Sequence, residues 1–91
     1  MKTLRVATCQ FSVESDIVHN QKEVLRLMDR ASADAADVAH FSECALSGYA
    51  GVEFPDMQSL DWDLLKRATR EIQQRAKELK LWVLLGSTHQ L

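Results

Sequence analysis

The sequence lacks long hydrophobic runs and any excess of charge of one sign. Its 91 residues carry 11 Lys and Arg against 13 Asp and Glu, for a net charge of −2, with no run of like charge. Proteins that bind nucleic acid or anionic membranes through charge display a basic patch, so neither partner is expected. The apolar segments are short and interrupted, and the first residues include Lys2 and Arg5. The sequence therefore predicts neither a signal peptide nor a transmembrane helix.

Cysteine, glycine and proline are also scarce. Two cysteines, Cys9 and Cys44, are too few for a disulfide scaffold, and without a secretion signal we expect reduced thiols and a cytoplasmic location. His19 and His89 have no partners at metal-ligand spacing, so neither a metal nor another cofactor is expected. Two of the three glycines and the single proline fall within residues 42–58, which indicates a long loop.

Three segments favour extended backbone. Residues 4–11 contain β-branched and aromatic side chains without Gly or Pro, and residues 38–41 form a second, shorter strand pattern. Residues 81–85 form a continuous apolar run that stops at Gly86, which is typical of a strand buried on both faces.

Two amphipathic helices are predicted between these strands. Their apolar residues recur every three or four positions, which places them on one face of a helix. Ser15 or Asp16 can cap the start of the first helix, and Ser59 or Asp61 the start of the second. The order strand, helix, strand, loop, helix, strand predicts an α/β fold with parallel strands, in a single domain over residues 1–91 without an internal boundary.

This topology predicts an uncovered sheet face. If the strands lie side by side in chain order, right-handed crossovers put both helices on one side of the sheet. Successive side chains of residues 81–85 point to opposite faces, so Trp82 and Leu84 cannot share a face with Val83, and apolar side chains lie on both faces of this strand. A bare apolar face favours association, so we expect a second layer from further sequence, another copy or a partner. A different strand order would put one helix on each face.

Glu43 is the candidate site residue. It follows the second predicted strand directly and opens the long loop, within the stretch of residues 41–51. In a parallel α/β sheet, ligands bind at the carboxyl ends of the strands, where a carboxylate can act as a general base. Carboxylates at strand ends are common, so spacing alone leaves a solvent-facing loop charge as the alternative.

The residues around Glu43 resemble the first catalytic signature of the nitrilase-like carbon–nitrogen hydrolases. In that family an apolar strand ends in Pro-Glu and continues to a Gly-Tyr pair, and residues 37–49 are similar. Ser42 stands where the family usually has proline, and Cys44 where leucine is common. The resemblance covers nearly the whole chain, including Val6 to Gln10 as the opening strand, Asn20 near the start of the first helix, and Leu81 to Ser87 after the second.

The resemblance implies a fold and a mechanism. The family fold is an α-β-β-α sandwich, of which this chain would be an amino-terminal segment, incomplete at 91 residues. The family's chemistry implies a small-molecule amide or nitrile substrate and a glutamate, lysine and cysteine triad. Glu43 matches the glutamate, whereas the other two come later in the family's sequences, so residues 1–91 are expected to be inactive alone. Tyr49 and Phe54 are expected to line the substrate pocket, and a homo-oligomer is expected because family members commonly assemble.

Two alternatives stay open. The first is a non-catalytic α/β module that associates with itself or with a partner through its exposed sheet face. The second is a minimal thiol enzyme in which Cys9 pairs with His40. Cys44 is a poor partner for the adjacent Glu43, because neighbouring side chains on extended backbone point apart.

Overall fold

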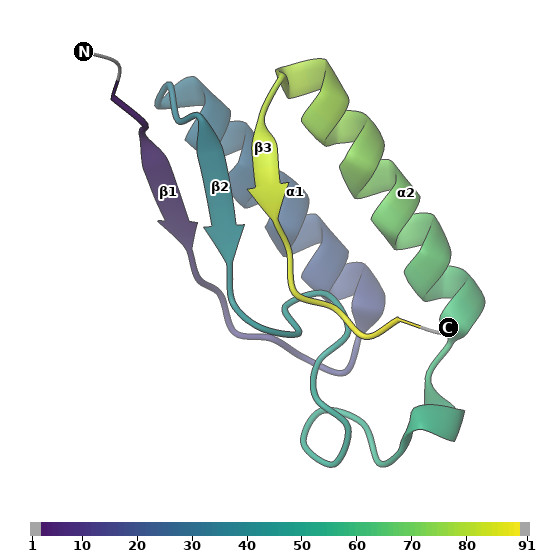
Figure 1. The fold of residues 1–91 in the computed structure, drawn as a ribbon. Helices are drawn as coiled ribbons and strands as arrows, with labels where there is room; N and C mark the ends of the chain where they lie inside the picture. The colour runs from purple at the N-terminus through teal and green to yellow at the C-terminus, as the bar shows by residue number, and fades with distance from the viewer. Residues whose placement is uncertain (1–2, 90–91) are drawn as a thin grey trace.

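The computed structural model describes residues 3–89 as a mixed α/β fold in two layers, a three-stranded parallel sheet and a pair of helices (Figure 1). The strands run in the same direction, so their carboxyl ends meet at one edge of the sheet. In chain order the elements are β1 (Val6–Cys9), α1 (Ile17–Ala33), β2 (Val38–Phe41), the 3-10 turn η1 (Met57–Ser59), α2 (Trp62–Leu79) and β3 (Trp82–Leu84).

Both helices begin at an aspartate. The Asp16 carboxylate accepts hydrogen bonds from the amides of Val18 at 2.9 Å and His19 at 3.3 Å, and the Asp61 carboxylate accepts from the amide of Leu64 at 3.0 Å. These bonds satisfy amides that have no partner inside the helix. Of the two capping residues predicted for each helix, the aspartate is therefore the cap.

The predicted chain-order sheet is confirmed. The order is β1-β2-β3, and α1 and α2 lie together behind the sheet (Figure 1), which excludes one helix on each face. Arg75 of α2 pairs with Asp29 of α1 at 2.9 Å between Nε and Oδ1, and Gln21 donates to Glu71 across the same helix pair. The core between sheet and helices includes Val24 and Met28 of α1, Leu65, Ala68 and Ile72 of α2, and Ala39 and Phe41 of β2.

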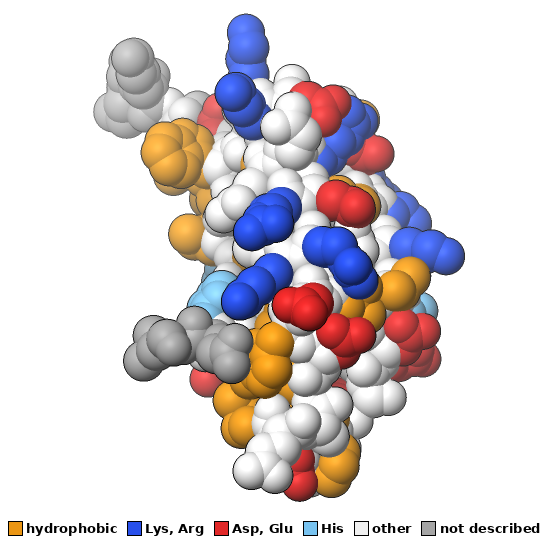
Figure 2. All heavy atoms as spheres, turned by 90° about the vertical axis from the view of Figure 1, so that its right-hand side faces the viewer, with side chains coloured by type: hydrophobic (Ala, Val, Ile, Leu, Met, Phe, Trp, Pro, Cys, Tyr) orange, Lys and Arg blue, Asp and Glu red, His pale blue; other side chains and the backbone are white. Residues whose placement is uncertain are grey.

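The predicted bare face is also confirmed. Two rows of paired residues form it, Val6, Val38 and Trp82 in one and Thr8, His40 and Leu84 in the other. Trp82 is 77% exposed and Leu84 is 58% exposed, so within these residues β3 is not buried on both faces as its apolar run predicts. In Figure 2, Lys and Arg side chains gather over the outer surface of α2, and hydrophobic side chains project at the left-hand edge, on the sheet side.

Strand β2 has the bounds that the sequence predicts, whereas β1 and β3 are shorter than predicted. Extended residues beyond a strand's partners have no ladder to join, and β2 offers four residues for pairing. β1 accordingly stops at Cys9 rather than Phe11, and β3 at Leu84 rather than Leu85. The predicted loop over residues 42–58 is present and contains a turn over residues 43–47.

Candidate active site

Glu43 lies where the sequence predicts, directly beyond the end of β2 at the carboxyl edge of the sheet. Its side chain is exposed. A shallow hollow beside it is lined by residues 40–43 from the end of β2 and residues 84–86 from the end of β3. The carboxylate is therefore accessible at the edge where parallel α/β sheets bind ligands.

The turn of residues 43–47, here called the Glu43 turn, is tightly folded. The amide of Ala45 donates to the Ser42 carbonyl at 3.3 Å, and the amide of Gly48 donates to the Cys44 carbonyl at 2.8 Å. Cys44 has a φ of 54°, a left-handed conformation that residues with a Cβ rarely adopt. Such a backbone persists only where its surroundings hold it in place.

The segment after β3 holds one side of the Glu43 turn. The amide of Leu46 donates to the Gly86 carbonyl at 3.2 Å. A Cβ at Gly86 would lie 2.5 Å from the Cys44 nitrogen and 2.7 Å from the Glu43 Cα, so only glycine permits this approach. The Ser47 hydroxyl, which is fully buried, accepts from the Thr88 amide at 3.0 Å.

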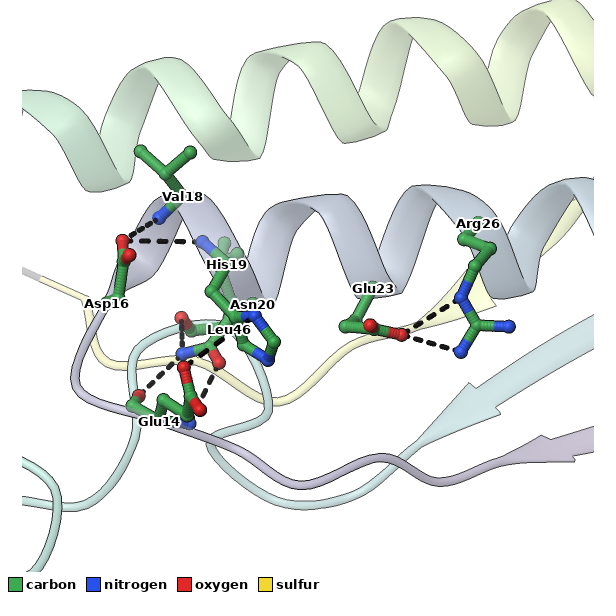
Figure 3. Close-up of polar contacts among 8 residues, drawn as sticks. All are labelled: Glu14, Asp16, Val18, His19, Asn20, Glu23, Arg26 and Leu46. Atoms are coloured by element: carbon green, nitrogen blue, oxygen red, sulfur yellow. Dashed lines mark hydrogen bonds and ion pairs between the residues drawn. The ribbon is translucent and has the colours of Figure 1, made fainter.

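Helix α1 holds the other side of the turn through Asn20. The Asn20 amide group donates to the carbonyls of Leu46 at 2.9 Å and Glu14 at 2.8 Å, and its oxygen accepts from the Glu14 amide at 2.9 Å (Figure 3). Figure 3 shows Asn20 lying between the loop that carries Glu14 and the Glu43 turn. Three segments far apart in the sequence thus meet around one turn.

The loop beyond the turn places Tyr49 near Glu43. A side-chain hydrogen bond to Glu43 is the largest of the effects that raise the pKa of Tyr49 to about 12, followed by desolvation and the nearby negative charge. The Glu53 carboxylate accepts from the Tyr49 amide at 2.9 Å and so fixes the backbone of this residue. Tyr49 itself is 42% exposed, which leaves part of its ring open to solvent beside Glu43.

A strand-end carboxylate in a fixed turn beside a tyrosine is the arrangement expected of the family that the sequence resembles. A comparison with protein-family models matches residues 5–90 to the family described as carbon-nitrogen hydrolase. The chain belongs to the carbon–nitrogen hydrolase family. A comparison with curated proteins found no match. Within residues 3–89 of this hydrolase chain, no helix is both long and apolar enough to cross a membrane.

The two residues predicted to bind substrate lie in different environments in this member of the carbon–nitrogen hydrolase family. Tyr49 is beside Glu43, whereas Phe54 is 7% exposed and packs with the hydrophobic core. The Phe54 carbonyl accepts from the Gly51 amide at 2.6 Å, which closes the small loop between them. Phe54 therefore supports the loop from the core side and presents little surface to a ligand.

The strand register excludes the alternative in which Cys9 pairs with His40. In the β1–β2 register Cys9 lies opposite Phe41, and His40 lies opposite Thr8, so the two side chains point to opposite faces of the sheet. Cys9 is 6% exposed, and burial raises the pKa of its thiol, which keeps it protonated at neutral pH. Cys44 is a free, half-buried thiol beside Glu43.

Within residues 3–89, no lysine lies at the site. Four lysines lie exposed on helices or at a helix end, namely Lys22, Lys66, Lys77 and Lys80, and Lys2 lies outside the described residues. No cluster of three His, Cys, Asp or Glu side chains suited to a metal ion lies within the described part of the chain.

Sequence reasoning missed most of the residues that hold the Glu43 turn. Asn20 carries a signal in the sequence, since it falls on the apolar stripe of α1 between Ile17 and Val24, where a polar side chain must find buried partners. Ser47 is one of several small residues in the loop and carries no such signal. Gly86 marks the end of an apolar run, but its close approach to the turn depends on the fold.

Proposed function

We propose that Glu43 is the general base in the hydrolysis of a carbon–nitrogen bond of a small amide or nitrile. The observation that carries this proposal is an accessible carboxylate in a fixed turn at the carboxyl edge of the sheet, in a chain of the carbon–nitrogen hydrolase family. A general base must keep its position while the substrate changes, and a turn tied on two sides supports such a role.

The proposed mechanism joins Glu43 to a lysine and a cysteine supplied from outside residues 1–91. A thiol near its ordinary pKa is mostly protonated at pH 7, so Glu43 takes the proton as sulfur attacks the substrate carbon. The lysine stabilises the negative charge that develops on the intermediate. For an amide, Glu43 then returns the proton to the departing nitrogen, which leaves a thioester on the cysteine. Water cleaves this thioester, with Glu43 taking a proton from the water and returning it to the sulfur. Neither Cys9 nor Cys44 is the proposed nucleophile, the first because it is buried on the helix side of the sheet.

The same proposal extends to the fold and the surroundings of the site. We propose that a second sheet covers the exposed row of Val6, Val38 and Trp82, which gives the four-layer sandwich of the family. Tyr49 is proposed to line the substrate pocket beside Glu43. A cytoplasmic location and assembly into a homo-oligomer are parts of the same proposal.

The reaction class is tested by joining residues 1–91 to the lysine- and cysteine-bearing segment of the family. Ammonia release is followed with a panel of amides, nitriles, carbamoyl compounds and ureido compounds. We expect turnover of at least one class by the longer polypeptide and none by residues 1–91 alone. Turnover by residues 1–91 that survives Glu43→Gln contradicts the proposal, as does a folded longer polypeptide that hydrolyses none of the four classes.

One observation favours a second candidate function, a non-catalytic module that assembles through the bare face. Trp82, Leu84 and Val6 are each at least half exposed on one side of the sheet. An apolar surface of this kind favours association in water. This function requires that residues 1–91 form a stable oligomer.

A further inference from the structure

The two buried polar side chains of the described residues both hold the Glu43 turn. Within residues 3–89, the polar or charged residues classed as buried are Asn20 and Ser47, each 0% exposed. We propose that Asn20 and Ser47 act together as positioning residues for Glu43, fixing its turn from opposite sides. The catalytic meaning of this inference rests on the proposed function, whereas the positioning itself is open to direct measurement.

Asn20 occupies a buried position of α1, where an apolar side chain is expected to pack in the core. It lies on the buried stripe of α1 between Ile17 and Val24. Burying an amide is unfavourable unless its donors and acceptor find partners, and Asn20 makes three hydrogen bonds of 2.8 to 2.9 Å. One of them goes to the carbonyl of Leu46, three residues beyond Glu43 (Figure 3). A buried polar residue is therefore used to tie the turn to the helix.

Ser47 ties the next residue of the turn to the segment beyond β3. Its hydroxyl accepts from the Thr88 amide at 3.0 Å, donates to the Gly48 carbonyl at 3.0 Å and lies 3.1 Å from the Thr88 hydroxyl. Leu46 and Ser47 are adjacent, so the bonds from α1 and from the segment beyond β3 reach consecutive residues. The turn is then unable to move with either segment alone.

Asn20 and Ser47, here called the clamp, act on Glu43 through the backbone of its turn. The Glu43 side chain is exposed and has several rotatable bonds, so its reach depends on where the backbone holds its Cα. The next residue, Cys44, has a φ of 54°, which needs support from its surroundings. Without the bonds to Leu46 and Ser47, we expect the turn to relax and Glu43 to leave Tyr49.

The single tyrosine of the chain provides a local readout of this placement. The neighbouring Glu43 carboxylate is the main cause that raises the pKa of Tyr49 to about 12. A titration of phenolate absorbance therefore reports whether Glu43 stays beside Tyr49. A purely structural role for Asn20 or Ser47 would lower stability without changing this contact.

The experiment compares two clamp variants, Asn20→Ala and Ser47→Ala, with two controls in the protein of residues 1–91. Val24→Ala removes another fully buried side chain of α1, and Thr69→Val removes a hydroxyl that bonds to the Leu65 carbonyl inside α2. We expect both clamp variants to move the Tyr49 ionisation toward its ordinary pKa of 10.0, and both controls to leave it unchanged. Circular dichroism at each pH identifies molecules that have unfolded.

Amide exchange at neutral pH decides the outcome for any variant that unfolds in alkali. The amide of Leu46 donates to the Gly86 carbonyl beyond β3, and the amide of Gly48 donates to the Cys44 carbonyl within the turn. We expect these two amides to exchange at least tenfold faster in Ser47→Ala and Asn20→Ala. The comparison is with whichever control, Val24→Ala or Thr69→Val, has the same free energy of unfolding. Unchanged Tyr49 ionisation and unchanged exchange in the clamp variants overturn the inference.

Activity separates this inference from the proposed function. In the longer polypeptide, we expect Asn20→Ala to lower kcat roughly a hundredfold with little change in KM, because a small misplacement of a catalytic group has effects of this size. If the longer polypeptide hydrolyses nothing, the proposed function fails while the titration and exchange results still decide the positioning. A clamp variant that changes KM alone contradicts the positioning of the base.

Discussion

At the scale of the residue, Glu43 acts on the neighbouring Tyr49. The hydrogen bond to the carboxylate favours the neutral phenol, so the pKa of Tyr49 is raised to about 12. A folded-state pKa above the unfolded value stabilises the protein below the unfolded pKa. That contribution is lost as pH rises from about 10 to about 12.

Replacing the carboxylate tests this contact. We expect Glu43→Gln to lower the pKa of Tyr49 toward 10.0, because the negative charge that opposes phenolate formation is gone. The free energy of unfolding of the variant should also decline less than that of the wild type over the same alkaline interval. Spectrophotometric titration and urea unfolding at several pH values measure the two effects. An unaltered Tyr49 titration would show that Glu43 does not contact the phenol.

Sequence reasoning predicted where Glu43 lies but not what holds its turn. Glu43 was predictable because a carboxylate directly after a strand pattern must lie at the sheet edge. Phe54 was predicted to line the substrate pocket, and it packs with the hydrophobic core at 7% exposure. The bond of Asn20 to Leu46 joins residues 26 positions apart, and no local pattern indicates such a contact.

At the scale of the element, helices were easier to predict than strands. The periodic apolar residues of α1 and α2 and their aspartate caps are local signals. Strand limits depend on the neighbouring strand, so β1 and β3 are shorter than their apolar patterns. The Glu43 turn depends on the left-handed conformation of Cys44, which the sequence does not indicate.

The approach of the segment after β3 to the Glu43 turn gives a prediction for this scale. A Cβ at Gly86 would lie 2.5 to 2.7 Å from backbone atoms of residues 42–44. We expect Gly86→Ala to lower the free energy of unfolding by about 1 to 3 kcal/mol, because backbone cannot yield as a side chain does.

Denaturant unfolding measures this change, with Ser87→Ala as the control at the adjacent, half-buried position. The control removes a hydroxyl without adding atoms near the turn, so we expect it to change stability by less than about 0.5 kcal/mol. Equal effects of the two substitutions would contradict the close approach of Gly86 to the turn.

At the scale of the whole molecule, the bare sheet face dominates. It was predictable because right-handed crossovers in chain order leave one side of the sheet without helices. One row on this face contains Val6, Val38 and Trp82. The second row contains His40 and Leu84.

The mass of the purified protein tests the bare face. We expect residues 1–91 to associate in solution, and Trp82→Lys to shift the population toward the monomer, because a charge on the apolar face opposes its burial. Sedimentation equilibrium measures the masses. Val52→Lys is the control, since Val52 is 76% exposed in the loop against 77% for Trp82 in the sheet. A monomer for the wild type, or equal dissociation by both variants, would contradict association through this face.

The role of Glu43 as the general base is tested most directly by one ratio. It compares kcat/KM of the wild type with that of Glu43→Gln in the longer, hydrolytically active polypeptide. Gln keeps the shape of the side chain but cannot take a proton from a thiol, so we predict a loss of roughly 10² to 10⁴-fold. Glu78→Gln, which changes an exposed carboxylate on α2, should leave the ratio near one. A Glu43→Gln enzyme that folds normally and keeps wild-type kcat/KM would show that Glu43 is not the base.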